Sequence, residues 1–313
     1  MHYGTLSAAV SIVVIAVFGI FGNVNIIVAI LRKSELRSKS GCLMCLIAIY
    51  DTISILFEIW TAKRLFGEEI LVKRYCFHTV APYFVILVTQ SYTLMALAVD
   101  RLIAIFYPIR YRQISTLCYL SFAFFPGVAI GVSFSILAEM YMDQETVAFC
   151  NPPMSLPTVI ESAYRTYTVA MNLSIIILYG ISLFALHRQK RLLRTIRDAR
   201  HSRHIQHQQQ IMRTIGVIMM VFVTAFFLIQ LVNFIIIYGE MDETLPTIEF
   251  IRGMSVVPIM VTFSQSFYVY WWRSLEYREV FKEQLKLVFP FLPFEKRLTV
   301  VPSNSRTLFH ISH

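Results

Sequence analysis

The chain has 313 residues, of which 57% are hydrophobic and only 15% are charged, and its mean hydropathy is +0.62. This composition excludes an ordinary soluble domain and is typical of a protein that crosses a membrane several times. The net charge of +9 does not require a nucleic-acid partner, because basic segments on the cytosolic side of a membrane protein face anionic lipid.

Seven apolar segments follow one another along the chain, and each is about 20 residues long or longer, which is enough to cross a bilayer. Lipid offers no hydrogen bonds to the backbone, so each segment must be helical. The first is too long for the apolar core of a signal peptide, and the third should tilt or project beyond the hydrocarbon layer. The predicted spans are residues 6–31, 42–62, 77–107, 117–140, 163–186, 211–238 and 248–272.

The distribution of Lys and Arg between the loops predicts the orientation. With the N-terminus outside, the cytosolic segments hold most of the 28 basic residues, and the exceptions on the outer side are Lys63, Arg64, Lys73, Arg74, Arg165 and Arg252. We therefore expect an extracellular N-terminus and a cytosolic C-terminus. The membrane domain covers residues 1–289, and residues 290–313 form a polar tail that we expect to be disordered.

Asp51 is predicted to be the lone ionisable group deep in the second span. Asn23 of the first span is its natural hydrogen-bond partner. A carboxylate inside the membrane suggests a switch site that could hold a cation such as sodium. The alternative is a buried polar pair that only fixes helix packing.

The third span ends in Asp100-Arg101-Leu102, and Pro108 and a basic cluster follow shortly after it. Burying both charges in lipid would cost several kcal/mol, so they must lie at the membrane boundary or inside the bundle. Arg101 can pair with Asp100 in one state and turn toward an opened inner cavity in the other, as a switch requires. The alternative is a salt bridge that only anchors the helix at the boundary.

Two further helical segments are expected on the cytosolic side. Residues 187–210 are strongly basic, with apolar residues at helical spacing. They predict an amphipathic extension of the fifth span or, alternatively, a solvated run of charge. Residues 273–288 predict a short amphipathic eighth helix along the inner leaflet, because one face carries Tyr277, Val280, Phe281, Leu285 and Val288.

The five cysteines divide between the two sides of the membrane. Cys42, Cys45 and Cys118 fall at inner span ends, where the cytosol keeps thiols reduced, whereas Cys76 and Cys150 face outside, where a disulfide can persist. A bridge between these two would stabilise the fold by about 4 kcal/mol in the chain-entropy model; the alternative is two unpaired thiols. A metal site at Cys42 and Cys45 is not expected, because they have no partner pair and lie in a membrane helix.

The chain is similar to the rhodopsin-like G-protein-coupled receptors over nearly its whole length. Cys76 precedes Arg101 by 25 residues, as in that superfamily, and further markers are Asn23, Ala48, Asp51, Pro108, Tyr179 and Tyr270. Within the superfamily it resembles the nematode serpentine chemoreceptors of the Srsx class, at residues 22–25, 38–41, 76–77, 82–83, 150–153 and 268–278. The resemblance implies that a heterotrimeric G protein couples to a switch made of Asp100, Arg101, Tyr179 and Tyr270.

The chain departs from the superfamily pattern in three spans. The seventh-span Asn-Pro-x-x-Tyr motif stands here as residues 266–270 without Asn or Pro, the sixth-span motif at residues 222–228 lacks Trp and Pro, and Met171 replaces the fifth-span proline. Without these prolines, helix kinks of the usual origin are not ensured. Glutamines also stand where an acid often restrains the arginine, at Gln208, Gln209 and Gln210.

The resemblance places the ligand pocket in the outer half of the bundle. Tyr83 stands where amine receptors carry an aspartate, and the seventh span has no Lys for a retinal Schiff base, so neither a biogenic amine nor retinal is expected. Aromatic walls with few polar groups suit a small, mostly apolar or neutral ligand; the alternative is that these aromatic residues only pack the helices. The candidate lining residues are Tyr83, Phe84, Leu87, Tyr167, Phe226, Gln230 and Asn233.

Taken together, these patterns predict an all-α seven-transmembrane bundle that acts as a chemosensory G-protein-coupled receptor. Its expected partners are a heterotrimeric G protein, membrane lipid and a small-molecule or peptide ligand, with no cofactor besides the sodium ion considered at Asp51. The expected location is the plasma membrane, with a sensory cilium as the specific site. The alternative is a transporter or channel, which would need ionisable residues along a path and often two related halves. An enzyme is not expected, because the spans hold no Ser/His, Asp/Asp or His-metal constellation.

Overall fold

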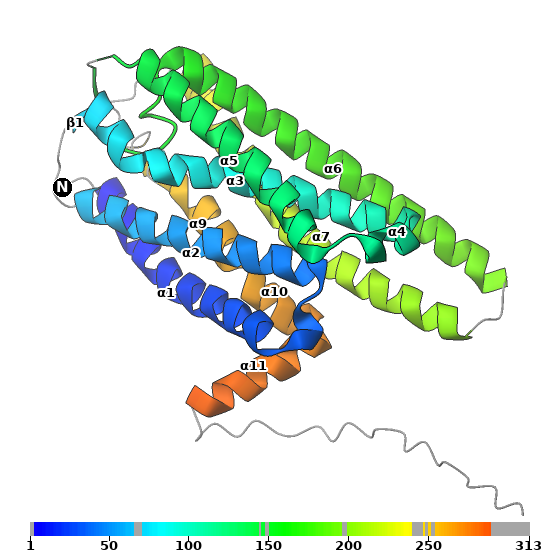
Figure 1. Cartoon of the computed structure of the whole chain (residues 1–313). Coiled ribbons are helices and arrows are strands. Elements are labelled where there is room, and N and C mark those ends of the chain that lie inside the picture. Colours follow the sequence, from blue (N-terminus) through cyan, green and yellow to red (C-terminus); the bar gives the residue numbers. More distant parts are fainter. Residues whose placement is uncertain are drawn as a thin grey trace, which may run out of the picture.

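The computed structural model describes residues 3–65, 71–143, 145–147, 150–195, 199–239 and 254–288, together with positions 247, 250 and 251. These residues form a bundle of long helices that run side by side (Figure 1). The seven-transmembrane all-α fold is therefore confirmed. We call the end that carries Cys76 the outer end and the end that carries Arg101 the inner end, following the predicted orientation.

The helices correspond to the predicted spans and extend them by a few residues at most ends. They are α1 (Tyr3–Arg32), α2 (Lys39–Leu65), α3 (Lys73–Phe106), α5 (Thr116–Met140), α6 (Thr158–Thr195), α7 (Ala199–Tyr238), α9 (Val256–Ser264) and α10 (Ser266–Arg273). Shorter elements are η1 (Ser34–Leu36), α4 (Pro108–Gln113), α11 (Leu275–Val288), and the strands β1 (Leu71–Val72) and β2 (Thr146–Val147).

The seventh span differs from the other six in its regularity. Within the described residues, α1, α2, α3, α5, α6 and α7 each contain a stretch that is long and apolar enough to cross a membrane. The seventh span is divided instead into α9 and α10, which meet at Gln265. No proline stands at this point; the Gln265 side chain donates from Nε2 to the Ile218 carbonyl of α7 at 3.1 Å. A polar side chain thus marks the irregularity that proline marks in the superfamily that the chain resembles.

The surface of the bundle is apolar and its interior is partly polar, as expected of helices in lipid. Leu117 and Phe122 on α5 are 77% and 70% exposed, and Val17 on α1 is 65% exposed. The buried polar residues instead line the interior, and they include Asn23, Asp51, Ser54, Glu58, Gln90, Thr93, Asp100, Arg101 and Gln265. Because burial removes these groups from water, we expect them to form hydrogen bonds within the protein.

Helix α3 lies at the centre of the bundle and packs against α2, α5 and α6, while α1 packs against α2 and α9. The close approach of α1 to the seventh span depends on a small residue. A methyl group added at Gly22 would come within 2.7 Å of Phe267 Cβ. The first and last spans are therefore held near each other by a position that tolerates no side chain.

The outer end is closed by the predicted disulfide between Cys76 and Cys150, which is confirmed with a Cα–Cα distance of 5.5 Å. Beside it, β1 and β2 pair antiparallel. Lys73 Nζ lies 3.1 Å from Asp143 Oδ2 and 3.2 Å from Glu145 Oε2. Covalent, backbone and ionic contacts thus tie the start of α3 to the segment that follows α5.

The predicted eighth helix is α11, which crosses the inner end of the bundle (Figure 1). Tyr277, Val280 and Phe281 are buried as expected. Val288 does not share this buried face, because it is 66% exposed. An interfacial helix divides its apolar residues between protein and lipid, and the last turn of α11 belongs to the surface available to lipid.

The basic segment after the fifth span is partly helical. Helix α6 continues to Thr195, well beyond the predicted span end at residue 186. The side chains of residues 192–209 lie outside the described residues, so the choice between an amphipathic face and a solvated run of charge stays a prediction. The tail at residues 290–313 likewise lies outside them.

Candidate functional site

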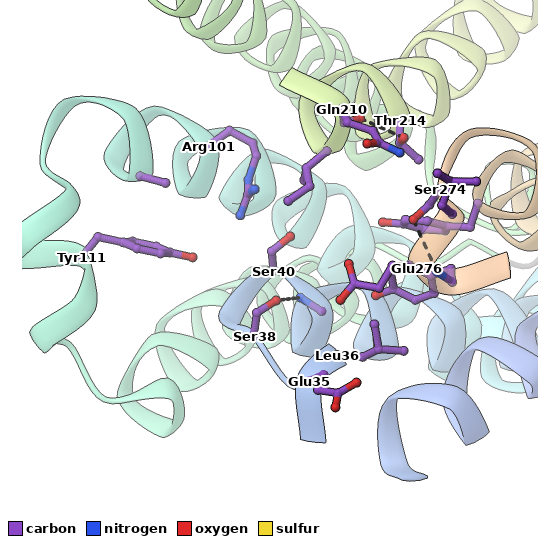
Figure 2. A pocket seen from close by; sticks show the side chains of 16 residues that line it. Glu35, Leu36, Ser38, Ser40, Arg101, Tyr111, Gln210, Thr214, Ser274 and Glu276 are labelled. Atoms are coloured by element: carbon purple, nitrogen blue, oxygen red, sulfur yellow. Dashed lines mark hydrogen bonds between the residues drawn. The ribbon is translucent and has the colours of Figure 1, made fainter. Parts of the chain in front are cut away.

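A cavity of about 390 Å³ opens at the inner end of the bundle. It is formed by side chains that are distant in sequence and come from the start of α2, the end of α3, α4, α7, α10 and α11 (Figure 2). Its polar lining residues include Ser38, Ser40, Arg101, Tyr111, Gln210, Thr214, Tyr270, Ser274 and Glu276. Hydroxyl, amide and guanidinium groups therefore face the same space.

Arg101 is the one basic side chain that lines this cavity among the described residues. It is only 4% exposed, and its Nε donates to Asp100 Oδ2 at 2.8 Å. Its Nη2 also reaches Asp100 Oδ2, so the predicted pair is present. A buried guanidinium that lost this partner would be strongly destabilised, which means that Arg101 can leave Asp100 only when another group or water receives it.

Tyr111 of α4 makes a second contact with Asp100. Its hydroxyl donates to Asp100 Oδ1 at 2.7 Å. Burial, and then the neighbouring Asp100 carboxylate, raise the pKa of the Tyr111 phenol, so it stays a protonated donor at neutral pH. Lys39 at the start of α2 lies 4.3 Å from the centre of the Tyr111 ring and donates to the Tyr111 carbonyl. Tyr111 therefore joins the inner ends of α2 and α3.

Tyr179 holds α6 against α7. Its hydroxyl donates to the carbonyl of Met212, one turn from Gly216. A methyl group added at Gly216 would lie 2.6 Å from Tyr179 Cζ, so only glycine leaves room for the ring. Gln210 of α7 also donates to the Arg273 carbonyl at 3.2 Å. Among the described residues, two neutral hydrogen bonds thus restrain the inner part of α7, where glutamine stands in the place of the acid that is frequent in the superfamily that the chain resembles.

Tyr270 lies at the junction of α10 and α11. It is buried, and its ring centre lies 4.3 Å from that of Tyr277. Both rings line the inner cavity with Arg101. The structure therefore brings Arg101 and Tyr270 to one cavity. Asp100 contacts Arg101, and Tyr179 lies at the contact between α6 and α7.

The predicted hydrogen bond between Asn23 and Asp51 is not formed in the described structure. Asp51 accepts instead from Gln90 Nε2 of α3 at 2.6 Å, and Asn23 donates from Nδ2 to the Phe263 carbonyl of α9 at 2.9 Å. The reason is that Gln90 points to α2 from the central helix, while α9 lies directly against α1. Both residues are buried as expected, and sodium binding near Asp51 stays a prediction.

The candidate ligand residues divide between different parts of the outer bundle. Phe84 packs between α3, α5 and α6, with its ring centre 4.9 Å from Tyr164 and 6.3 Å from Phe134. Tyr167 donates to the Val88 carbonyl at 3.3 Å. Tyr83 turns the other way, toward α2, because adjacent helical residues point in different directions.

The remaining candidate ligand residues do not gather around a common pocket in the described structure. The Phe226 ring lies 4.6 Å from that of Phe222, and Leu87 packs with apolar residues of α1, α2 and α9. Gln230 is half-buried on α7, and the side chain of Asn233 lies outside the described residues. Ligand contact by any of these residues stays a prediction.

Glu58 is a buried carboxylate that the sequence analysis missed. It is 7% exposed, and its Oε1 accepts a hydrogen bond from the Tyr83 hydroxyl at 2.7 Å. Asp51 is therefore not the lone buried carboxylate of α2. The sequence contained a usable signal, because a residue seven positions after Asp51 lies two turns farther on the same helix face.

Comparison with models of protein families gives a match over most of the chain. A family model described as "Serpentine type 7TM GPCR chemoreceptor Srsx" matches residues 16–285, from within α1 to within α11. No curated protein matches the sequence. The matched region contains the disulfide, the inner cavity and every polar contact described above.

Proposed function

We propose a coupling mechanism for this chain, which belongs to the serpentine Srsx family of seven-transmembrane chemoreceptors and is therefore a chemosensory G-protein-coupled receptor. In this mechanism a small extracellular ligand binds in the outer half of the bundle. It favours a second arrangement of the helices, in which the inner end of α7 has moved outward. A heterotrimeric G protein then enters the inner cavity and contacts Arg101.

The observation that carries the proposal is the position of Arg101 in the inner cavity. Its guanidinium is held by Asp100 and Tyr111 stabilises that carboxylate, while the opposite wall consists of α7 and α10. The bonds that hold the α7 wall at Tyr179 and Gln210 are neutral. A ligand can shift such an equilibrium only by its difference in affinity for the two arrangements, so contacts made by the outer half must change when α7 moves.

The proposed orientation places the disulfide outside the cell and α11 on the cytosolic leaflet. The chain is a multi-pass membrane protein, and for a chemoreceptor the plasma membrane, and specifically a sensory cilium, is the location that we propose. The basic residues around the inner cavity would then face both anionic lipid and the G protein.

Replacing Arg101 tests the mechanism. We expect Arg101→Ala to reach the cell surface and to lose second-messenger output, because the variant keeps the apolar helix faces and removes the side chain that the G protein contacts. Arg110→Ala is the matched control, since Arg110 is an exposed arginine of α4, and its output should stay close to that of the wild type. Surface immunostaining and a second-messenger assay in the same cells measure both. Normal output from Arg101→Ala would refute the mechanism.

A further inference from the structure

Two polar contacts join α2 to α3, and the coupling mechanism uses neither. Asp51 meets Gln90, and Glu58 meets Tyr83. Each contact lies seven residues from the other on both helices, in opposite order, which is the register of antiparallel neighbours two turns apart. Glu58 is seven residues from the end of α2 at Leu65, which corresponds to about 10 Å of helix. The second contact therefore lies in the outer part of the bundle.

The Glu58 carboxylate has no cationic partner among the described residues. Tyr83 donates to Oε1 and leaves Oε2 for another donor. The basic residues near the outer ends of α2 and α3 point elsewhere. The Arg64 guanidinium lies 4.6 Å from the Trp60 ring centre, and Lys63 is exposed. Lys73 pairs with Asp143 and Glu145, and Arg74 pairs with Glu139. A charge at 7% exposure without a counter-ion is costly, and inside a membrane such a group marks a functional site.

The surroundings of Glu58 define the chemistry of a missing partner. The Phe57 ring stacks on the Tyr83 ring, with centres 5.3 Å apart and planes 7° apart, and an aromatic pair beside a carboxylate favours an organic cation. Ile59 and Leu87 provide apolar contacts nearby. A metal ion is disfavoured, because the described residues contain no group of three His, Cys, Asp or Glu side chains that could hold one.

We propose that Glu58 is the counter-ion of a protonated amine ligand with a small apolar body. Tyr83 is a positioning residue that holds the carboxylate, and the Phe57–Tyr83 pair contacts the ammonium group or the adjacent carbon atoms. This assignment rests on the proposed receptor function and names its ligand class. It reverses the expectation drawn from Tyr83, since α2 supplies the carboxylate that is absent at position 83 of α3.

Matched pairs of amines and alcohols test the proposal on the full-length receptor. The probes are isoamylamine with isoamyl alcohol and 2-phenylethylamine with 2-phenylethanol, which differ only in the cationic group. We expect the amines to activate a G-protein reporter and the alcohols to be weaker by about tenfold or more, as for loss of a charged hydrogen bond. Glu58→Gln should lose the same factor for the amines. Glu139→Gln is the control, because Glu139 also lies at the outer end but pairs with Arg74.

A second measurement does not depend on activation. The melting temperature of the purified receptor in lipid nanodiscs should rise with either amine, and this rise should be absent in Glu58→Gln. Amines that neither activate nor stabilise the wild type, or that act equally on Glu58→Gln, overturn the proposal. If Glu58→Gln does not reach the surface, Glu58→Asp decides: a weaker amine response supports the proposal, and an unchanged response contradicts it.

Basal nucleotide exchange by a co-expressed G protein separates this proposal from the coupling mechanism. That exchange needs no ligand, and we expect wild-type membranes to show it and Arg101→Ala membranes to lack it. Inert amines with intact basal exchange would refute only the role of Glu58. Absence of exchange in the wild type would instead refute the coupling mechanism itself.

Discussion

Both oxygens of the Asp100 carboxylate are used in the structure: Oδ2 accepts from Arg101 and Oδ1 accepts from Tyr111. A charge-assisted hydrogen bond is stronger than a neutral one, so Tyr111 stabilises the ionised carboxylate with which Arg101 pairs. The sequence suggested the Asp100–Arg101 pair, but it did not suggest Tyr111, because α4 turns back toward α3 only in the folded chain. At the scale of single residues, the Asp100 carboxylate is therefore held by Tyr111 as well as by Arg101.

Removing the Tyr111 hydroxyl is expected to raise basal signalling. Tyr111→Phe deletes the donor to Asp100 and leaves the ring against Lys39, which should weaken the closed arrangement by about 1–2 kcal/mol. This corresponds to roughly a tenfold higher basal output if the open arrangement is a minor population. A ligand-free second-messenger assay, normalised to surface expression, measures it.

Tyr107→Phe is the matched control for Tyr111→Phe, because Tyr107 is an exposed neighbour in sequence. Its basal output should equal that of the wild type. Equal outputs from the Tyr111 and Tyr107 variants would show that the hydroxyl contact to Asp100 does not restrain the receptor.

At the scale of helices, the seam between α6 and α7 depends on a glycine. Tyr179 reaches the Met212 carbonyl only because Gly216 leaves space for its ring. The superfamily pattern would have suggested an ionic contact at the inner end of α7, and the chain has glutamine there instead. A neutral contact costs little to break, which suits a helix that must move when the receptor opens.

Adding one methyl group to this seam should release α7. Gly216→Ala displaces the Tyr179 ring and loses a hydrogen bond of about 1 kcal/mol, which should raise basal output roughly fivefold. Gly180→Ala provides the control on the facing helix, since no atom lies within 4 Å of the added group. That variant should behave as the wild type or be slightly more stable, because alanine favours the helix. A basal output of Gly216→Ala no higher than that of Gly180→Ala would contradict the role of this seam.

At the scale of the whole molecule, the two ends of the bundle are built differently. The outer end is closed by a disulfide, a pair of short strands and the ion pairs of Lys73. The inner end contains a cavity of about 390 Å³, and side-chain hydrogen bonds hold the helices around it. A covalently fixed outer end gives the helices a fixed point, so that a small change near the ligand can become a larger displacement at the inner ends.

Loss of the disulfide should affect folding in the same way whichever of its two cysteines is replaced. The bridge spans 74 residues, and its loss is expected to cost about 4 kcal/mol in the chain-entropy model. Cys76→Ser and Cys150→Ser should therefore show matching reductions in surface expression, and the double variant should be no worse, because both changes remove one bond. Cys118→Ser, which alters an exposed free thiol, should traffic normally. Labelling of both Cys76 and Cys150 by a thiol reagent in native membranes would contradict the bridge.

The sequence by itself determined the spans, the disulfide and the presence of α11. Lipid requires long apolar helices whose backbone groups are all hydrogen-bonded, and such apolar segments can be recognised directly in the linear sequence. The predicted ends differ from the observed ones mainly where helices continue into water, as α6 does up to Thr195. The redox difference between the two sides of the membrane likewise left Cys76 and Cys150 as the pair that could form a bridge.

Only the tertiary structure decided which polar side chains meet inside the bundle. Asn23 contacts Phe263, Asp51 contacts Gln90, and Glu58 contacts Tyr83, and none of these pairings was predicted. The physical reason is that a span surrounded by lipid and other helices is apolar around most of its circumference, so its sequence does not show which face is interior. That face depends on how close the neighbouring helices come, and positions such as Gly22 and Gly216 set this distance through the side chains that they lack.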